Sequence, residues 1–222
     1  REFNPRRQHQ LPSKILPPKH AKRQQDGAPC YNLSPMSTFP TASIFADEPI
    51  LSDVAQYWAE KRRGRLMPDR SDIDPLHLPP RVWPNLLLSE PVPDSSAIYY
   101  RLVGSAHVER YTFDFTGKTT AEIMQGSYRQ YMESLYGAVL GRGLPVYSES
   151  RFRWDTGGFA AGHAFTRRLM LPLSLGDETK AAQVLSVQVW PTRLPVSPRP
   201  IPELGSNEEF YGNLILLDRD SF

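Results

Sequence analysis

The chain has 222 residues and a formal net charge of +2, with 40% hydrophobic and 23% charged residues. This length fits one domain with tails and argues against two full domains. No apolar run is long enough to cross a membrane, and the single cysteine, Cys30, excludes an internal disulfide and indicates a reducing, cytoplasmic compartment.

The basic charge belongs to the first 45 residues, which carry seven Lys or Arg against two acidic residues, a formal +5. This segment is rich in Pro and Gln and lacks apolar periodicity, so we expect it to be disordered. Met36 lies just before the globular pattern and is a candidate natural start, which would make residues 1–35 non-native. The rival interpretation, which the composition favours less, is an arm that binds nucleic acid or anionic membrane.

The pattern changes at about residue 50, where apolar residues recur at helical spacing up to Gly64. Ser52 or Asp53 can cap the start of this amphipathic helix. Its apolar face, with Leu51, Val54 and Trp58, is the surface through which we expect two copies to pair.

Three aspartates follow, at positions 69, 72 and 74. They lack the Gly and Glu positions of a calcium-binding EF-hand loop, so capping and turn roles are favoured. In particular, Asp74 followed by Pro75 predicts the cap and first residue of a helical turn.

The rest of the pattern alternates between strand and helix periods. We expect a hairpin of strands at 85–90 and 97–103, a helix at 105–111, a capping box at Thr119 and Glu122, a long helix from Ser127 to about Gly143, and strands at 145–154, 165–173 and 185–189. This order predicts an α+β fold with a five-stranded antiparallel sheet, helices covering one face, and the additional N-terminal helix.

Three strings carry a family resemblance: Tyr57-Trp58 with Arg62-Arg63-Gly64 and residues 67–75, then residues 100–104, then Thr116-Gly117-Lys118. In order and spacing they resemble the single-domain PAS-like proteins of alphaproteobacteria. The resemblance covers about residues 50–191. It implies a five-stranded antiparallel sheet, helices enclosing a small internal cavity, and a role as a sensor or dimerisation module rather than as a catalyst.

Side chains that are apolar in body and polar at the tip are candidates to line such a cavity. Core filling is the alternative for each aromatic residue, and two strand arginines would pair an acidic ligand only if they pointed inward. The ligand-binding candidates are Tyr100, Arg101, His107, Tyr111, Tyr128, Met132, Trp154 and Arg167.

Several specific chemistries are disfavoured. Gly117-Lys118-Thr119 resembles the end of a P-loop, but Thr112 stands where its first glycine is required. The five histidines lack metal-site spacing, His107 is the one candidate haem ligand, and Cys30 lies far from any flavin photosensing position. We therefore expect no metal, disfavour haem and flavin, and leave the cofactor unknown.

The sequence thus predicts a sensory domain that binds a small molecule or a protein partner and signals to a separate protein. The alternatives are a nucleic-acid-associated factor using the basic tail, and an enzyme with an unrecognised site; no catalytic motif is present. Residues 192–222 read as a Pro-rich linker followed by an apolar segment, Phe210 to Leu217, that docks as a strand or a partner peptide.

Overall fold

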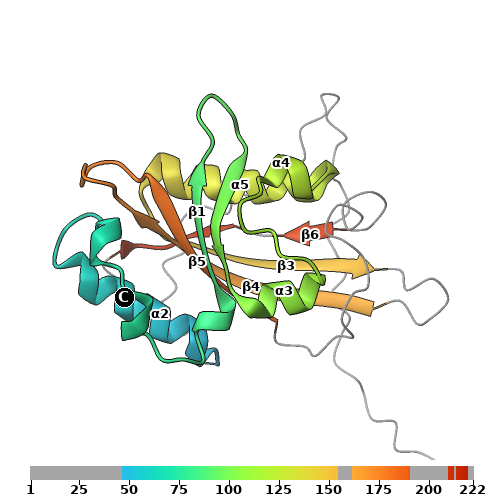
Figure 1. Ribbon diagram of the computed structural model, residues 1–222, viewed down its shortest axis with the longest axis horizontal. Helices are drawn as coiled ribbons and strands as arrows, with labels where there is room; N and C mark the ends of the chain where they lie inside the picture. Colours follow the sequence, from blue (N-terminus) through green and yellow to red (C-terminus); the bar gives the residue numbers. More distant parts are fainter. Residues whose placement is uncertain (1–46, 155–161, 191–209, 213, 220–222) are drawn as a thin grey trace, which may run out of the picture.

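The computed structural model describes residues 47–154, 162–190, 210–212 and 214–219. The expectations for residues 1–45, including Cys30 and Met36, and for the Pro-rich linker lie outside these ranges. Within them, the strands form one antiparallel sheet with helices on both of its faces (Figure 1).

The elements follow the predicted order. The helices are α2 (Pro49–Arg62), α3 (Ser105–Tyr111), α4 (Thr120–Ile123) and α5 (Gly126–Arg142), with short 3-10 turns at Arg70–Asp72, Pro75–His77 and Trp83–Asn85. The strands are β1 (Leu86–Pro91), β2 (Ile98–Val103), β3 (Val146–Trp154), β4 (Gly162–Leu173), β5 (Gln183–Val189), β6 (Phe210–Gly212) and β7 (Ile215–Leu216).

The five expected strands are confirmed, in the spatial order β2-β1-β5-β4-β3. Strand β1 pairs with its hairpin partner β2 on one side and with the distant β5 on the other, where Leu86 lies opposite Val187. The sheet is wider than predicted because β6 and β7 both pair with β3. The apolar C-terminal segment therefore docks as a strand.

Helix α5 packs across one face of the sheet together with α3 and α4. The predicted long helix is confirmed, and its apolar stripe, with Tyr131, Leu135, Tyr136 and Val139, is buried there. The helix ends at Gly143, whose φ of 60° is the left-handed conformation that glycine adopts at little cost, and whose N–H donates to the Val139 carbonyl at 2.8 Å.

Helix α2 packs on the opposite face of the sheet. It begins at Pro49, earlier than the Ser52 or Asp53 cap that we expected, because proline lacks an N–H and suits the first turn. Leu51, Val54 and Trp58 are 0% exposed. The expected pairing of two copies through these side chains is therefore corrected: they are enclosed within their own domain.

The aspartate-rich string between α2 and β1 holds the turn between β4 and β5. The Asp69 carboxylate accepts from the backbone N–H of Gly176 at 2.7 Å and of Ser71 at 2.9 Å, and these bonds hold its pKa well below the usual range. Asp72 pairs with Arg65, and Asp74 caps the turn at Pro75 as predicted. These carboxylates are structural, and no cluster suited to a metal ion occurs among the described residues.

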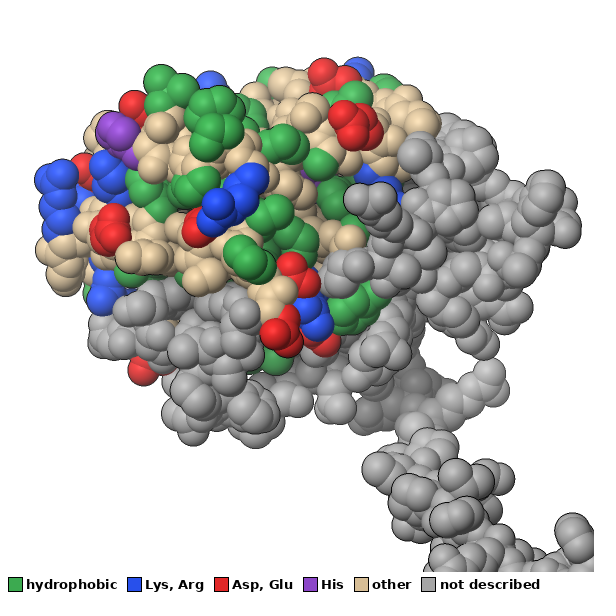
Figure 2. All heavy atoms as spheres, turned by 90° about the horizontal axis from the view of Figure 1, so that it is seen from below, with side chains coloured by type: hydrophobic (Ala, Val, Ile, Leu, Met, Phe, Trp, Pro, Cys, Tyr) green, Lys and Arg blue, Asp and Glu red, His purple; other side chains and the backbone are tan. Residues whose placement is uncertain are grey.

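The surface carries charges of both signs. On the face shown in Figure 2, acidic and basic side chains are interspersed among apolar ones over the described residues. No broad area of one sign is visible on this face, so its described part offers no continuous surface for a phosphate backbone.

Candidate functional site

The sheet face beneath α5 carries seven buried polar side chains, none more than 3% exposed. They come from four neighbouring strands: Ser148 and Ser150 on β3, Thr166 and Arg168 on β4, Ser186 and Gln188 on β5, and Ser89 on β1. We call this set the interior polar face.

Strand register brings these residues together. Ser148 lies opposite Arg168, and Arg168 lies opposite Gln188, so the three form one row across β3, β4 and β5. Ser150 and Thr166 form the next row. Because residues two apart in a strand share a face, every one of these side chains points to the same side of the sheet.

The opposite face of the same strands is mainly apolar, and its charged residues Arg167 and Glu149 pair with each other. The intervening residues Tyr147, Leu169, Leu171, Leu185 and Val187 pack with α2 in a hydrophobic cluster. Burying polar groups beneath a helix costs free energy unless they find partners. Packing a helix on a sheet therefore explains the apolar face but does not explain the interior polar face.

Arg168 lies at the centre of the interior polar face and is 2% exposed. Its Nε donates to Gln188 Oε1 at 2.9 Å, its Nη1 donates to Ser150 Oγ at 2.7 Å, and its Nη2 donates to the Tyr128 hydroxyl at 3.3 Å. The guanidinium is thus held from three sides, and all three acceptors are neutral amide or hydroxyl groups.

The tyrosines around Arg168 supply no negative charge. Burial raises the pKa of the Tyr100, Tyr111 and Tyr136 hydroxyls above their ordinary value, so these groups stay protonated at neutral pH. Within the described residues Arg168 has hydrogen bonds but no carboxylate partner. In the part of the chain that the structure describes, the interior polar face therefore carries one positive charge without a counter-ion.

Several hydroxyls on the interior polar face lack hydrogen-bond partners among the described residues: Ser148 Oγ, Thr166 Oγ1 and Ser186 Oγ. Buried polar atoms in native proteins are nearly always paired, with protein, water or a bound molecule. These three atoms thus mark places where a further polar group would be stabilised.

His107, on α3, borders this region. Its Nε2 donates a hydrogen bond to the backbone carbonyl of Asn85 at 3.1 Å, and its ring meets the rings of Phe115 and Trp190 edge to face. Burial is the main cause that lowers the pKa of His107 to about 4. His107 is thus a buried, neutral histidine that is hydrogen-bonded within the domain.

The lowered pKa of His107 predicts acid sensitivity. An unfolded histidine has a pKa of about 6.5, so the folded state binds fewer protons and its stability falls as the pH drops from 6.5 towards 4. Between pH 7 and 4.5 this group alone is expected to remove about 2 kcal/mol from the free energy of unfolding. Urea unfolding at both pH values measures the loss.

The matched variant is His107→Gln, whose amide can donate to Asn85 but does not titrate. Its free energy of unfolding should change less between pH 7 and 4.5 than that of the wild type, by about the same 2 kcal/mol. An equal pH dependence in both proteins would show that His107 is accessible to protons in the folded state.

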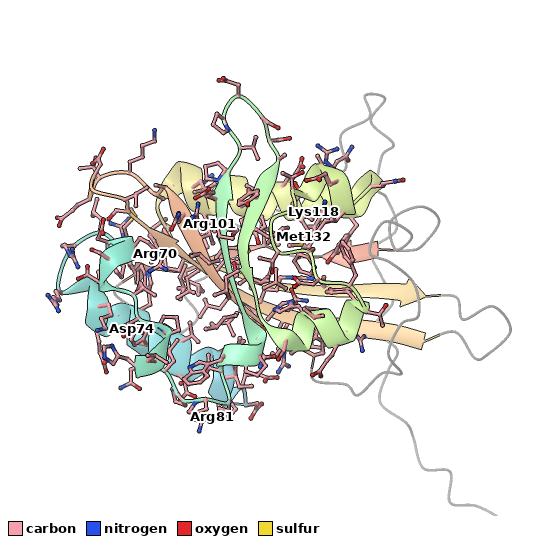
Figure 3. All side chains as sticks on the ribbon, in the orientation of Figure 1. Arg70, Asp74, Arg81, Arg101, Lys118 and Met132 are labelled. Atoms are coloured by element: carbon pink, nitrogen blue, oxygen red, sulfur yellow. The ribbon has the colours of Figure 1, made fainter. Side chains whose placement is uncertain are left out.

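Five of the predicted ligand-binding residues lie together between the helices and this sheet face: Tyr100, His107, Tyr111, Tyr128 and Met132. Figure 3 shows Met132 on the sheet side of α5. Trp154 ends β3, and its side chain lies outside the described part of the structure.

The two predicted arginines lie elsewhere, which corrects their assignment. Arg101 of β2, whose label stands beside the β1–β2 hairpin in Figure 3, has a side chain 51% exposed and pairs with Glu90 at 2.9 Å. Arg167 lies on the α2 side of β4, where it pairs with Glu48 at 2.7 Å and Glu149 at 3.3 Å. Each points away from the interior polar face because of its parity in the strand.

The sequence analysis missed Arg168 itself. Leu169 and Leu171 share one parity along the strand, which is typical of a strand with a single buried face, and Arg168 has the other parity. Both faces of β4 are in fact covered. The available signal was the long helix from Ser127, whose apolar stripe requires a second sheet face to pack on.

One comparison with known proteins agrees with this architecture. A family model described as PAS domain matches residues 47–185. A solved structure described as "Flavin Analogue Sheds Light on Light-Oxygen-Voltage Domain Mechanism" is 15% identical with a TM-score of 0.34, over 51% of this chain and 81% of that chain. So low a TM-score carries no argument about a ligand. A comparison with curated proteins found no match.

No helix in the described ranges combines the length and apolarity that crossing a membrane requires.

Proposed function

Because the chain belongs to the PAS domain family, whose domains serve sensing and signalling, we propose that it binds a small molecule on the interior polar face and passes the change to a separate protein partner. The observation that carries the proposal is the contrast between the two sheet faces. One is mainly apolar, packs with α2 and pairs its charged residues with each other, whereas the other buries an arginine without a carboxylate partner among the described residues and unpaired hydroxyls beneath α5.

A bound molecule would stabilise the fold by pairing with buried polar groups that otherwise lack partners among the described residues. Each buried hydroxyl or cation without a full set of partners destabilises the protein. Proteins keep such groups where function needs them, and a small-molecule site typically combines apolar walls with a few convergent polar groups. The interior polar face and the aromatic side chains of α3 and α5 form this combination.

Helix α5 is suited to transmit binding. Tyr128 of α5 hydrogen-bonds Arg168, so a ligand that binds Arg168 beside Tyr128 would alter how α5 packs on the sheet. One turn further along α5, Glu133 accepts from Thr120 of α4 at 2.8 Å and from Ser96, in the β1–β2 loop, at 2.8 Å. Movement of α5 would therefore reach α4 and the β1–β2 loop, where a partner can detect it.

The unpaired hydroxyls provide a test. In Ser148→Ala and Thr166→Val no hydrogen bond is lost, so the ligand-free protein should keep its free energy of unfolding or gain up to about 1 kcal/mol. The matched control is Ser174→Ala, also buried, whose hydroxyl contacts Asp69 at 3.2 Å and Pro68 at 3.4 Å. It should lose about 1 kcal/mol.

The same variants are compared for ligand retention by mass spectrometry of the intact protein under native conditions. We expect the wild type to carry a non-covalent mass that denaturation removes, and Ser148→Ala and Thr166→Val to carry less of it, while Ser174→Ala retains it. The proposal would be contradicted by a wild type without bound mass whose experimental structure shows only side chains beneath α5.

A further inference from the structure

Resting on the proposed function, we propose that the ligand is a small organic monocarboxylate whose carboxylate group pairs with Arg168. The inference starts from the side chain itself. A guanidinium stays protonated at any physiological pH, so Arg168 is a fixed positive charge. It is enclosed at 2% exposure between β4 and α5.

The charge balance calls for a single negative charge. A buried charge is costly unless it is paired, and Arg168 has no carboxylate partner in the described part of the chain. Among the neighbouring titratable groups, His107, with a pKa of about 4, is neutral, and the raised pKa values of Tyr111 and Tyr136 keep those side chains protonated. The other buried cation among the described residues, Arg110 of α3, lies over the ring of Trp190. A monoanion would neutralise the site, whereas a dianion would leave a buried negative charge.

The free donors of Arg168 match a carboxylate in number. A guanidinium has five N–H bonds, and described acceptors occupy three of them, at Gln188, Ser150 and Tyr128. The two that remain suffice for the two oxygens of one carboxylate, the group that arginine binds most specifically. Ser148 Oγ, opposite Arg168 in the register, adds an unpaired hydroxyl that can also donate.

The side-chain amide of Gln188 holds the Arg168 guanidinium in a fixed orientation. Gln188 accepts from Arg168 through Oε1, and its Nε2 donates to the Tyr111 hydroxyl at 3.4 Å. This chain of hydrogen bonds fixes the plane of the guanidinium before any ligand arrives. Pre-organised donors of this kind lower the entropic cost of binding.

The surrounding side chains favour an organic anion over an inorganic one. Tyr128, Tyr131 and Met132 of α5 and Tyr111 of α3 are buried in the same cluster. Aromatic rings and a thioether contact hydrocarbon favourably but offer little to a fully hydrated ion. A carboxylate attached to a compact apolar body, such as a ring, therefore fits both the charge and the walls.

Benzoate is a suitable probe, with benzamide as its uncharged counterpart and sodium chloride to match the ionic strength. Thermal unfolding of the full chain should show a rise in Tm that increases with the benzoate concentration. Benzamide should need at least a 10-fold higher concentration to produce the same rise. Arg168→Met should need at least a 10-fold higher benzoate concentration for the same rise in Tm. The ligand-free variant should stay folded, because an apolar side chain of similar length replaces an uncompensated charge.

The matched control is Arg167→Met, one residue away on the opposite sheet face, which should leave the response to benzoate unchanged. Arg168→Lys, which keeps the charge but loses the forked donor, should respond more weakly than the wild type and covers the case in which Arg168→Met does not fold.

The outcomes separate this inference from the proposed function. Equal responses to benzoate and benzamide, or a co-purified uncharged molecule, would overturn the carboxylate and leave the small-molecule sensor standing. An equal response to chloride would overturn the organic anion. No response to any probe, together with no co-purified mass, would overturn both.

Discussion

Replacing Trp58 by alanine is expected to lower the free energy of unfolding by about 3–5 kcal/mol, the range for removing a large aromatic side chain from a core. Trp58 is 0% exposed between α2 and the sheet, and its indole N–H donates to the Pro172 carbonyl of β4 at 2.9 Å. The substitution leaves a cavity and an unpaired carbonyl together. Urea unfolding followed by circular dichroism measures the loss.

Trp58→Phe separates the two contributions, since it keeps most of the ring and removes only the donor. We expect it to lose about 1–2 kcal/mol. If Trp58→Ala cost less than about 1 kcal/mol, α2 would not be anchored on its own sheet, and the pairing of two copies through this helix would have to be reconsidered.

Replacing Gly104 by alanine is expected to cost about 3 kcal/mol, at the upper end for overpacking. The backbone angles at Gly104 suit any residue; the constraint is space. A Cβ atom there would lie 2.3 Å from the Pro84 carbonyl oxygen and 2.7 Å from that of Trp83. These are backbone atoms and cannot swing aside. The Gly104 N–H also donates to the Leu86 carbonyl at 2.8 Å, so the junction of β2 and α3 would have to shift as a unit.

Gly137→Ala is the matched control, because a Cβ atom at this position in the middle of α5 meets nothing within 4 Å. Alanine there should raise the free energy of unfolding by about 0.5–1 kcal/mol through its higher helix propensity. Thermal unfolding of the two variants should move in opposite directions, and a neutral Gly104→Ala would contradict the close approach to Pro84.

Elements marked by a regular spacing of apolar residues or by a local capping motif were predictable from the sequence. The stripe on α5, the β1–β2 hairpin and the capping box at Thr119 are local patterns, and the structure has each of them. The box is closed in both directions, with the Thr119 N–H donating to Glu122 at 2.8 Å. Local hydrogen bonds and side-chain spacing determine such features, so no distant contact is needed to infer them.

The sequence did not predict in the same way what packs against the apolar face of α2 or against each face of β4. The apolar face of α2 shows that Trp58 is buried, but the same pattern suits a partner molecule or the domain's own sheet. Likewise, the alternation along β4 separates Arg167 from Arg168 without saying which of the two meets solvent. Only the placement of α2 and α5 on opposite faces decides it, and that is a tertiary property.

The order of the strands also determines when the sheet can form during synthesis on the ribosome. Strand β1 reaches its second partner only when β5 emerges, since Leu86 pairs with Val187, and at ordinary rates of synthesis the intervening chain takes roughly 5–20 s to appear. During that interval β1 has an open edge on the side that β5 later occupies. The nascent chain can therefore pair incorrectly with other chains until β5 is synthesised. Conditions that slow translation between β2 and β5 would lengthen this period.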